Sequence, residues 1–283
     1  MMFALSLVLV ANSFDEVKGA QISGYYVVDG VRLHYLDWGG TGDVVLIITG
    51  TGDTAYAYEK FAPRFTDQFR VIALTRRGYG KSDKPESGYD IPTLSQDVLG
   101  FMDHSNIKRA HIICHSAGGD ETTYLAVNFP ERVGRLVYME AAYNREKVPE
   151  LERLDPMGAG KPSSREQELH WKGMDAFRPD FKSIKAPVLS FYSIFDRHPA
   201  VDDDTAPELK VKAEKFFKEY IRPYQMDNIA QFRKDVPHAQ VVEILNSDHY
   251  FFEDAQQAET VRETICTFLK GKSGDFNNIM LLP

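Results

Sequence analysis

Short apolar runs alternate with longer segments of helical periodicity along most of this chain of 283 residues. The runs are hydrophobic on both faces, which is typical of buried parallel strands. They cover residues 44–48, 71–74, 111–113, 136–139, 188–192 and 241–245. The helical patterns cover residues 55–65, 93–104, 117–129, 207–234 and 255–269. This alternation predicts a doubly wound, mostly parallel α/β sheet.

Two segments depart from the alternation. Residues 25–28 and 31–36 read as strands on either side of Asp29-Gly30, a dipeptide typical of two-residue hairpin turns. They predict an antiparallel hairpin at the N-terminal edge of the sheet. Residues 144–185 carry several prolines and glycines around an aromatic-bearing segment. We expect this stretch to be a short cap inserted above the sheet, within one domain spanning residues 21–283.

The composition narrows the class of protein. A hydrophobic content of 43% in a chain of this length is enough for one sizeable core. Lys and Arg number 33 against 41 Asp and Glu, a net charge of −8, and no basic cluster is interleaved with aromatic residues. Nucleic acid is therefore a poor candidate partner. Cys114 and Cys266 form neither a disulfide framework nor a metal-ligand spacing, so we expect no metal.

The start of the chain is apolar. Residues 1–11 are apolar apart from Ser6, and residues 11–13 are small, as at a signal-peptidase site. We expect residues 1–20 to be a leader and the protein to be periplasmic or secreted. No Lys or Arg precedes Lys18, so the alternative is a short apolar arm on a cytoplasmic protein. The run is too short to serve as a stable membrane anchor.

The sequence Cys-His-Ser-Ala-Gly-Gly at residues 114–119 lies between an apolar run and a helical pattern. It predicts a nucleophile elbow, a tight strand-to-helix turn that presents the hydroxyl of Ser116. A helix N-cap is the ordinary role of a serine in such a place, but the glycines and the downstream partners favour the nucleophile. We expect His115, beside it, to be a packed polar side chain rather than a second base.

A serine nucleophile needs an imidazole to accept its proton and a carboxylate to orient that imidazole. His249 follows the last predicted strand, and Asp196 follows the strand at 188–192. Both loops open on the carboxyl edge of the sheet, the same edge as the elbow. We predict the catalytic residues Ser116, Asp196 and His249, with Glu140 after the strand at 136–139 as the alternative acid.

With these residues in place, the sequence resembles the α/β-hydrolase family from about residue 25 to about residue 269. Residues 70–82 resemble the family's strand and the Arg-Gly-x-Gly-x-Ser turn that follows it, and residues 49–52 occupy the place of its oxyanion loop. The resemblance implies that the backbone amides of Thr51 and Ala117 stabilise an oxyanion.

Three positions depart from the family pattern. Cys114 and Ser193 stand where glycines are usual, and Thr49 stands in place of a histidine. None of them removes a reacting atom, so we expect the departures to affect the shape of the pocket rather than the chemistry.

The resemblance and the predicted triad imply a cofactor-independent serine hydrolase that cleaves a small or medium carboxylic ester through an acyl-enzyme. Lactonase, thioesterase, carbon–carbon bond hydrolase, iminopeptidase and cofactor-free perhydrolase activities are also compatible with a serine triad. Epoxide hydrolases and haloalkane dehalogenases of this fold use a carboxylate nucleophile, and the serine at position 116 argues against both. The alternative from another class is a ligand-binding protein that turns over slowly or not at all.

The predicted cap has a face of larger apolar side chains. Trp171, Met174 and Phe177 fall at near-helical spacing. By default such a stripe packs against the protein, but it can also roof an apolar substrate pocket. The sequence identifies neither the substrate nor the oligomeric state.

Overall fold

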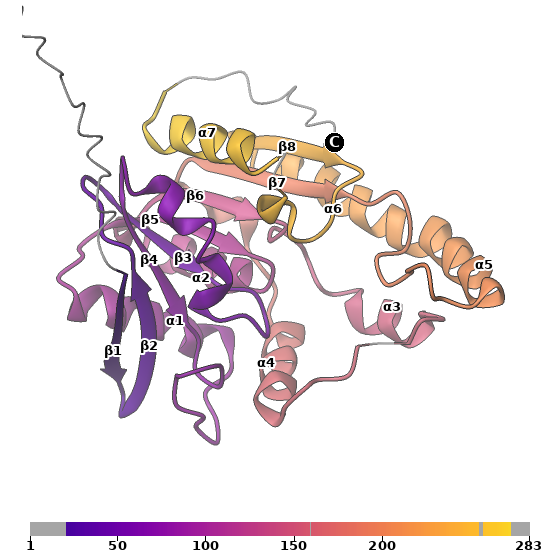
Figure 1. Ribbon diagram of the computed structural model, residues 1–283, viewed down its shortest axis with the longest axis horizontal. Helices are drawn as coiled ribbons and strands as arrows, with labels where there is room; N and C mark the ends of the chain where they lie inside the picture. Colours follow the sequence, from indigo (N-terminus) through magenta and orange to yellow (C-terminus); the bar gives the residue numbers. More distant parts are fainter. Residues whose placement is uncertain (1–20, 159, 255–256, 273–283) are drawn as a thin grey trace, which may run out of the picture.

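The computed structural model describes residues 21–158, 160–254 and 257–272. The predicted leader at residues 1–20 lies outside the described residues. Within them, one sheet has the strand order β1-β2-β4-β3-β5-β6-β7-β8 (Figure 1). The strands are β1 (Ile22–Val28), β2 (Val31–Asp37), β3 (Val44–Ile48), β4 (Arg70–Thr75), β5 (Ala110–His115), β6 (Val133–Met139), β7 (Val188–Ile194) and β8 (Gln240–Leu245).

The sheet is parallel from β4 to β8 and antiparallel at its N-terminal edge. β1 pairs with β2, and β2 with β4, in antiparallel register. The β1–β2 turn is formed by Asp29 and Gly30, with φ angles of 48° and 80°. A type I′ turn needs both central residues in the left-handed region, so this dipeptide suits the turn. The predicted fold class is confirmed.

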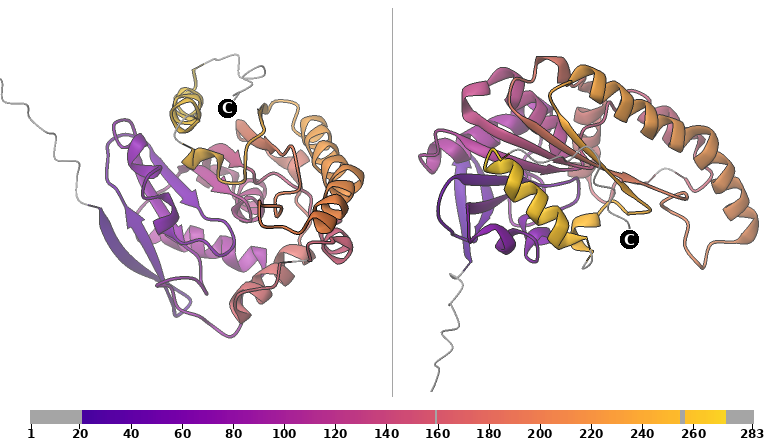
Figure 2. Two further views of the ribbon diagram at one scale, coloured as in Figure 1. Left: turned by 45° about the vertical axis from the view of Figure 1, so that its right-hand side comes forward. Right: turned by 90° about the horizontal axis from the view of Figure 1, so that it is seen from above.

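Helices cover both faces of the sheet. The α-helices of the described residues are α1 (Ile91–His104), α2 (Gly118–Asn128), α3 (Val148–Leu154), α4 (Arg165–Ala176), α5 (Pro207–Phe216), α6 (Arg222–Asp235) and α7 (Ala258–Leu269). Successive side chains of a strand point to opposite faces. In β3, Leu46 and Ile48 join the core cluster under α1, α2 and α6, whereas Val45 and Ile47 join the cluster under α7. Figure 2 shows α7 and the α5–α6 pair on opposite sides of the sheet. No helix in the described ranges has the length and apolarity needed to cross a membrane.

The helix predicted over residues 55–65 is wrong. This segment forms two short 3₁₀ turns, Ala55–Tyr58 and Ala62–Phe65, and Pro63 lies at the start of the second. Proline has no N–H to donate and clashes with the preceding turn, so a continuous helix is interrupted there. The helix predicted over residues 207–234 is α5 and α6 joined by a π-helical turn at Phe217–Ile221.

The segment between β6 and β7 holds α3 and α4. Figure 1 shows both helices outside the layers that cover the sheet. α4 begins at Arg165 with Ser164 as its N-cap, whose hydroxyl accepts a hydrogen bond from the backbone N–H of Gln167. Such a cap satisfies one of the free amides of the first turn.

The strand-to-helix turn between β5 and α2 packs very tightly. Ser116 has a φ of 52°, in the left-handed region. A Cβ added at Gly118 would lie 2.6 Å from the carbonyl oxygen of Ile48, and one added at Gly119 would lie 1.9 Å from that of Ala141. Only glycine fits at either position.

Cys114, which precedes the serine by two residues and stands where the family usually has a glycine, lies in the core. Its side chain is fully buried in the cluster under α1 and α2, and its thiol donates to the carbonyl oxygen of Val137 at 3.5 Å. Burial raises the pKa of this thiol, so it stays protonated and packs as a small apolar side chain.

Replacing Gly119 with Ala should destabilise the protein, because the new Cβ would overlap the carbonyl oxygen of Ala141. We expect the free energy of unfolding in urea to fall by about 3 kcal/mol, as in overpacked cores. Gly160→Ala is the control, since its nearest neighbour, the ring of Trp171, would lie 3.8 Å away. Equal stability of Gly119→Ala and the wild type would contradict the tight packing.

Candidate active site

The candidate residues gather at the carboxyl edge of the parallel strands. Ser116 follows β5, Glu140 follows β6, and both have left-handed φ angles, 52° and 50°. Asp196 lies in the loop after β7, and His249 in the loop after β8. Carboxyl ends of parallel strands share one edge of the sheet, where ligands of open α/β sheets bind. The predicted placement of these residues on one edge therefore agrees with the topology.

The loop after β3 lies against the candidate nucleophile. A Cβ added at Gly50 would be 3.3 Å from the Cβ of Ser116. The backbone N–H groups of Thr51 and Ala117 donate no hydrogen bond within the described part of the chain. Two amides without partners beside a serine could stabilise an oxyanion.

His249 is half-buried, and its ring lies 4.5 Å from the ring of His115, centroid to centroid. Burial lowers the pKa of His249 to about 3, with the charges of His115 and Arg145 acting in the same direction and Asp53 opposing them. The imidazole is therefore neutral at pH 7 and able to accept a proton. Its ring nitrogens make no hydrogen bond to Ser116 or to any other described residue.

His115 connects the loop after β8, which carries His249, to the loop after β3. It is fully buried, and its Nε2 lies 3.0 Å from the carbonyl oxygen of His249, so this nitrogen must carry a proton and donate it. Its Nδ1 lies 3.6 Å from Oδ2 of Asp53. The hydroxyl of Tyr250 donates to the same carboxylate at 3.3 Å. Sequence reasoning missed Asp53, although it directly follows the glycine-rich loop.

The two candidate acids differ in environment. Asp196 is exposed and makes no hydrogen bond to any described residue. Glu140 is buried and accepts hydrogen bonds from the hydroxyl of Tyr143 at 2.6 Å and the N–H of Ser193 at 2.9 Å. Burial raises the pKa of Glu140 from its ordinary value of 4.5 to about 7. Neither carboxylate forms a hydrogen bond or an ion pair with His249 in the described residues, and the choice of acid stays a prediction.

Ser193 links Glu140 to the loop after β8, which carries His249. Its backbone N–H donates to Glu140, and its hydroxyl donates to the carbonyl oxygen of Asp248 at 2.6 Å. Asp248 directly precedes His249 in the chain. The position of the His249 loop is thus linked, through one serine, to the position of Glu140.

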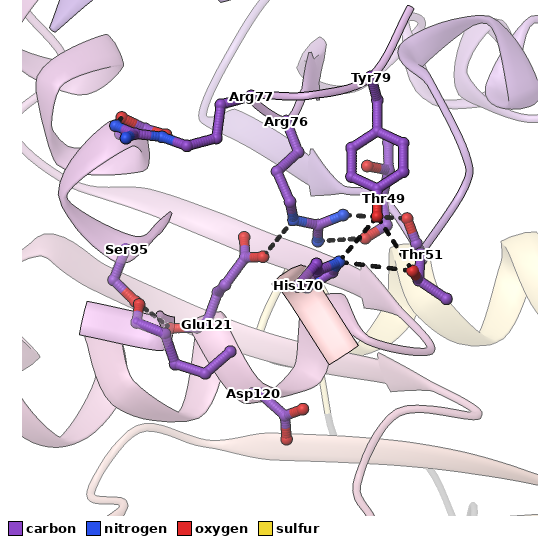
Figure 3. Close-up of polar contacts among 12 residues, drawn as sticks. Thr49, Thr51, Arg76, Arg77, Tyr79, Ser95, Asp120, Glu121 and His170 are labelled. Atoms are coloured by element: carbon purple, nitrogen blue, oxygen red, sulfur yellow. Dashed lines mark hydrogen bonds and ion pairs between the residues drawn. The ribbon is translucent and has the colours of Figure 1, made fainter. Parts of the chain in front are cut away.

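Three arginines, of which Arg76 and Arg77 are buried and Arg145 is half-buried, are each paired with a carboxylate. The closest contacts are Arg76–Glu121 at 2.5 Å, Arg77–Asp97 at 2.6 Å and Arg145–Asp120 at 3.0 Å. Arg145 also donates to the backbone carbonyl of Ser116 at 3.2 Å. Asp120 and Glu121 lie in the first turn of α2, where the helix dipole favours negative charge. Figure 3 shows Arg76 pointing toward Glu121 on one side and toward the loop after β3 on the other.

The helix α4 contacts the loop after β3 through one hydroxyl. Oγ1 of Thr51 accepts a hydrogen bond from the indole N–H of Trp171 at 3.2 Å. It also lies 3.2 Å from the hydroxyl of Tyr79 and 3.4 Å from Nδ1 of the buried His170 (Figure 3). Burial lowers the pKa of His170 well below its ordinary value, so the ring is neutral. The spacing of histidines in the sequence carried no signal for this contact.

The predicted pocket residues of the cap pack against the elbow. Met174 is buried in a cluster with Ala117, and Trp171 and Phe177 lie partly buried against the same cluster. This is the packing role that their spacing predicts by default; a role in substrate binding stays a prediction. No group of three or more His, Cys, Asp or Glu side chains in the described ranges could hold a metal ion.

Comparison with known proteins identifies the family. Residues 43–222, more than half of the chain, match the family model described as alpha/beta hydrolase fold. The chain belongs to the α/β-hydrolase family.

Relatives similar to this chain are named for different hydrolase activities. A putative carbamate hydrolase, RutD, from Caulobacter segnis is 33% identical over 39% of this chain, and the match spans 42% of that relative's length. A 2-(acetamidomethylene)succinate hydrolase from Mesorhizobium japonicum is 24% identical over 76% of this chain and 84% of its own.

Solved structures agree at the level of fold. The crystal structure of an E-2-(acetamidomethylene)succinate hydrolase superposes with a TM-score of 0.68 at 20% identity, covering 89% of this chain and all of that one. The enol-lactonase from Burkholderia xenovorans LB400 superposes with a TM-score of 0.62 at 21% identity, covering 87% of this chain and all of that one.

Replacing Glu140 with Gln should change how the stability of this α/β-hydrolase depends on pH. The pKa of Glu140 is raised in the folded state, so the unfolded chain ionises first, and stability falls as pH rises from about 4.5 to about 7. Glu140→Gln should remove this part of the fall, measured by urea unfolding across that range. Asp196→Asn is the matched control and should retain it; a Glu140→Gln curve parallel to the wild type would refute the raised pKa.

Proposed function

We propose that this chain is a cofactor-independent serine hydrolase that cleaves small or medium carboxylic esters through an acyl-enzyme. The proposal rests on Ser116, held at a left-handed φ of 52° between β5 and α2 beside two backbone amides that have no hydrogen-bond partner among the described residues. A strained turn of this kind presents a serine hydroxyl for attack. The hydrolase names of the relatives support the same class of reaction.

In the proposed mechanism, Oγ of Ser116 attacks the carbonyl carbon of the ester. His249, neutral because burial lowers its pKa to about 3, accepts the serine proton and then gives it to the leaving alcohol. The amides of Thr51 and Ala117 donate to the oxyanion of the tetrahedral intermediate. Water, activated by the same imidazole, then attacks the acyl-enzyme, releases the carboxylic acid and restores the serine.

A carboxylate must support the imidazolium that forms during each attack. Burial disfavours the charged ring of His249, so the need for such support is strong. We favour Glu140 for this role over Asp196, because Glu140 is buried and is tied through Ser193 to the loop that carries His249.

A slow or non-catalytic ligand-binding protein is the second candidate. It is favoured by one observation: in the described residues neither ring nitrogen of His249 is hydrogen-bonded to Ser116 or to a carboxylate. A fluorophosphonate probe separates the two functions, because it labels an activated serine quickly and an inactive one hardly at all.

Replacing Ser116 with Ala should abolish hydrolysis of p-nitrophenyl butyrate. We expect kcat to fall about 10⁴-fold or more, as for loss of a serine nucleophile, with the unfolding free energy little changed. Fluorophosphonate labelling of the wild type should map to Ser116 and disappear in the variant. Undiminished turnover by Ser116→Ala would rule out the proposed nucleophile.

Glu140→Gln and Asp196→Asn should separate the two candidate acids. Each replacement removes a carboxylate with little change of shape. Loss of the orienting carboxylate costs about 10⁴-fold in kcat in serine hydrolases, and we expect a loss approaching this in Glu140→Gln and a near wild-type kcat in Asp196→Asn. The reverse result would assign the role to Asp196.

A further inference from the structure

Arg76 makes contacts that its position in the chain does not predict. It directly follows β4, yet its side chain is only 3% exposed. Its guanidinium donates to the backbone carbonyls of Thr49 at 2.8 Å and Gly50 at 3.0 Å, and its Nε donates to Glu121 at 2.5 Å (Figure 3). One side chain thus joins the loop after β3 to the helix that follows the nucleophile.

The two carbonyl contacts determine where the next amides point. In a trans peptide the C=O and the following N–H are fixed in one plane and point in opposite directions, and the described chain has no cis peptide bond. Because the carbonyl of Gly50 points to Arg76, the N–H of Thr51 points away from it. The same holds for the carbonyl of Thr49 and the N–H of Gly50.

We propose that Arg76, anchored by Glu121, is a positioning residue that orients the Thr51 amide toward the oxyanion. This inference rests on the serine-hydrolase function proposed above. Arg76 touches neither substrate nor reacting atoms; it acts by holding two peptide planes of the loop. The guanidinium suits this role, because its planar fork of donors can reach two carbonyls and a carboxylate at once.

The charge state of the pair fits the proposal. Burial alone would lower the pKa of Arg76, but Glu121, together with the neighbouring Tyr79 and Tyr58, outweighs burial and raises it. Arg76 is therefore charged, and its hydrogen bonds to the loop are charge-assisted. The hydroxyl of Thr51 lies 3.2 Å from the hydroxyl of Tyr79, so the turn after β4 holds the same loop through a second residue.

Arg76→Lys tests the role, because a lysine keeps the charge but loses the planar fork. Arg77→Lys is the matched control: Arg77 is the next residue, is also buried, and pairs with Asp97 at 2.6 Å, but makes no hydrogen bond to residues 49–52 in the described chain. We expect Arg76→Lys to lower kcat for p-nitrophenyl butyrate about 10- to 100-fold with little change in KM, as for a misplaced oxyanion donor. Binding of a trifluoromethyl ketone, which forms an oxyanion with the serine, should weaken by a similar factor.

A second variant covers the case in which Arg76→Lys fails to fold. Glu121→Gln keeps the shape of the anchor and should lower kcat by a smaller factor. The double variant Arg76→Lys/Glu121→Gln should lose no more than Arg76→Lys alone, because both act through the same contacts. A wild-type kcat in both folded single variants, or an equal loss in Arg77→Lys, would overturn the positioning role.

Failure of this inference differs from failure of the proposed function. A wild type that neither turns over p-nitrophenyl butyrate nor labels with the fluorophosphonate would overturn both. Turnover that depends on Ser116 but is unaffected in folded Arg76→Lys would overturn the positioning role alone.

Discussion

The site depends on how closely three backbone segments approach one another around Ser116. The turn after β5, the loop after β3 and the segment after β6 meet where there is no room for a β-carbon. Glycines at positions 50, 118 and 119 allow this approach, since an added Cβ at each would lie 3.3 Å or less from its neighbours. This contact between segments holds the backbone of Ser116 in the left-handed region. The packing at the sheet edge therefore also determines where the serine hydroxyl points.

The arginines near these segments form ion pairs with carboxylates. Three arginines enter the interior near the elbow, and each meets a carboxylate within 3.0 Å. Breaking a buried pair is costly, because the remaining charge is left unpaired in a poorly solvated place. Two of the carboxylates come from the first turn of α2. The helix that follows Ser116 is therefore held by ion pairs both to the residue after β4 and to the segment after β6.

The sequence predicted the architecture well where the signal was local. Strands hydrophobic on both faces and the Asp29-Gly30 turn led to the observed sheet, whereas the helical pattern of residues 55–65 wrongly predicted one helix across the proline that interrupts it. At the site, chain order indicated that Ser116 and His249 follow strand ends. It favoured Asp196 over Glu140, because both residues follow neighbouring strands and chain order does not show burial; in the structure Glu140 is buried and Asp196 is exposed. The contacts of Asp53 and His170 were not predicted, since they join residues distant in sequence.

The hydroxyl of Thr51 has a consequence for how this fold could diversify. It is shared between the body of the protein, through Tyr79, and the inserted helix α4, through Trp171 and His170. In a modular enzyme, an insertion could be exchanged to change which molecules are accepted while the machinery below stays intact. Here α4 is hydrogen-bonded to the loop beside Ser116, so a change in this segment would also change the contacts of that loop. An exchange of the insertion would have to bring its own partners for Thr51.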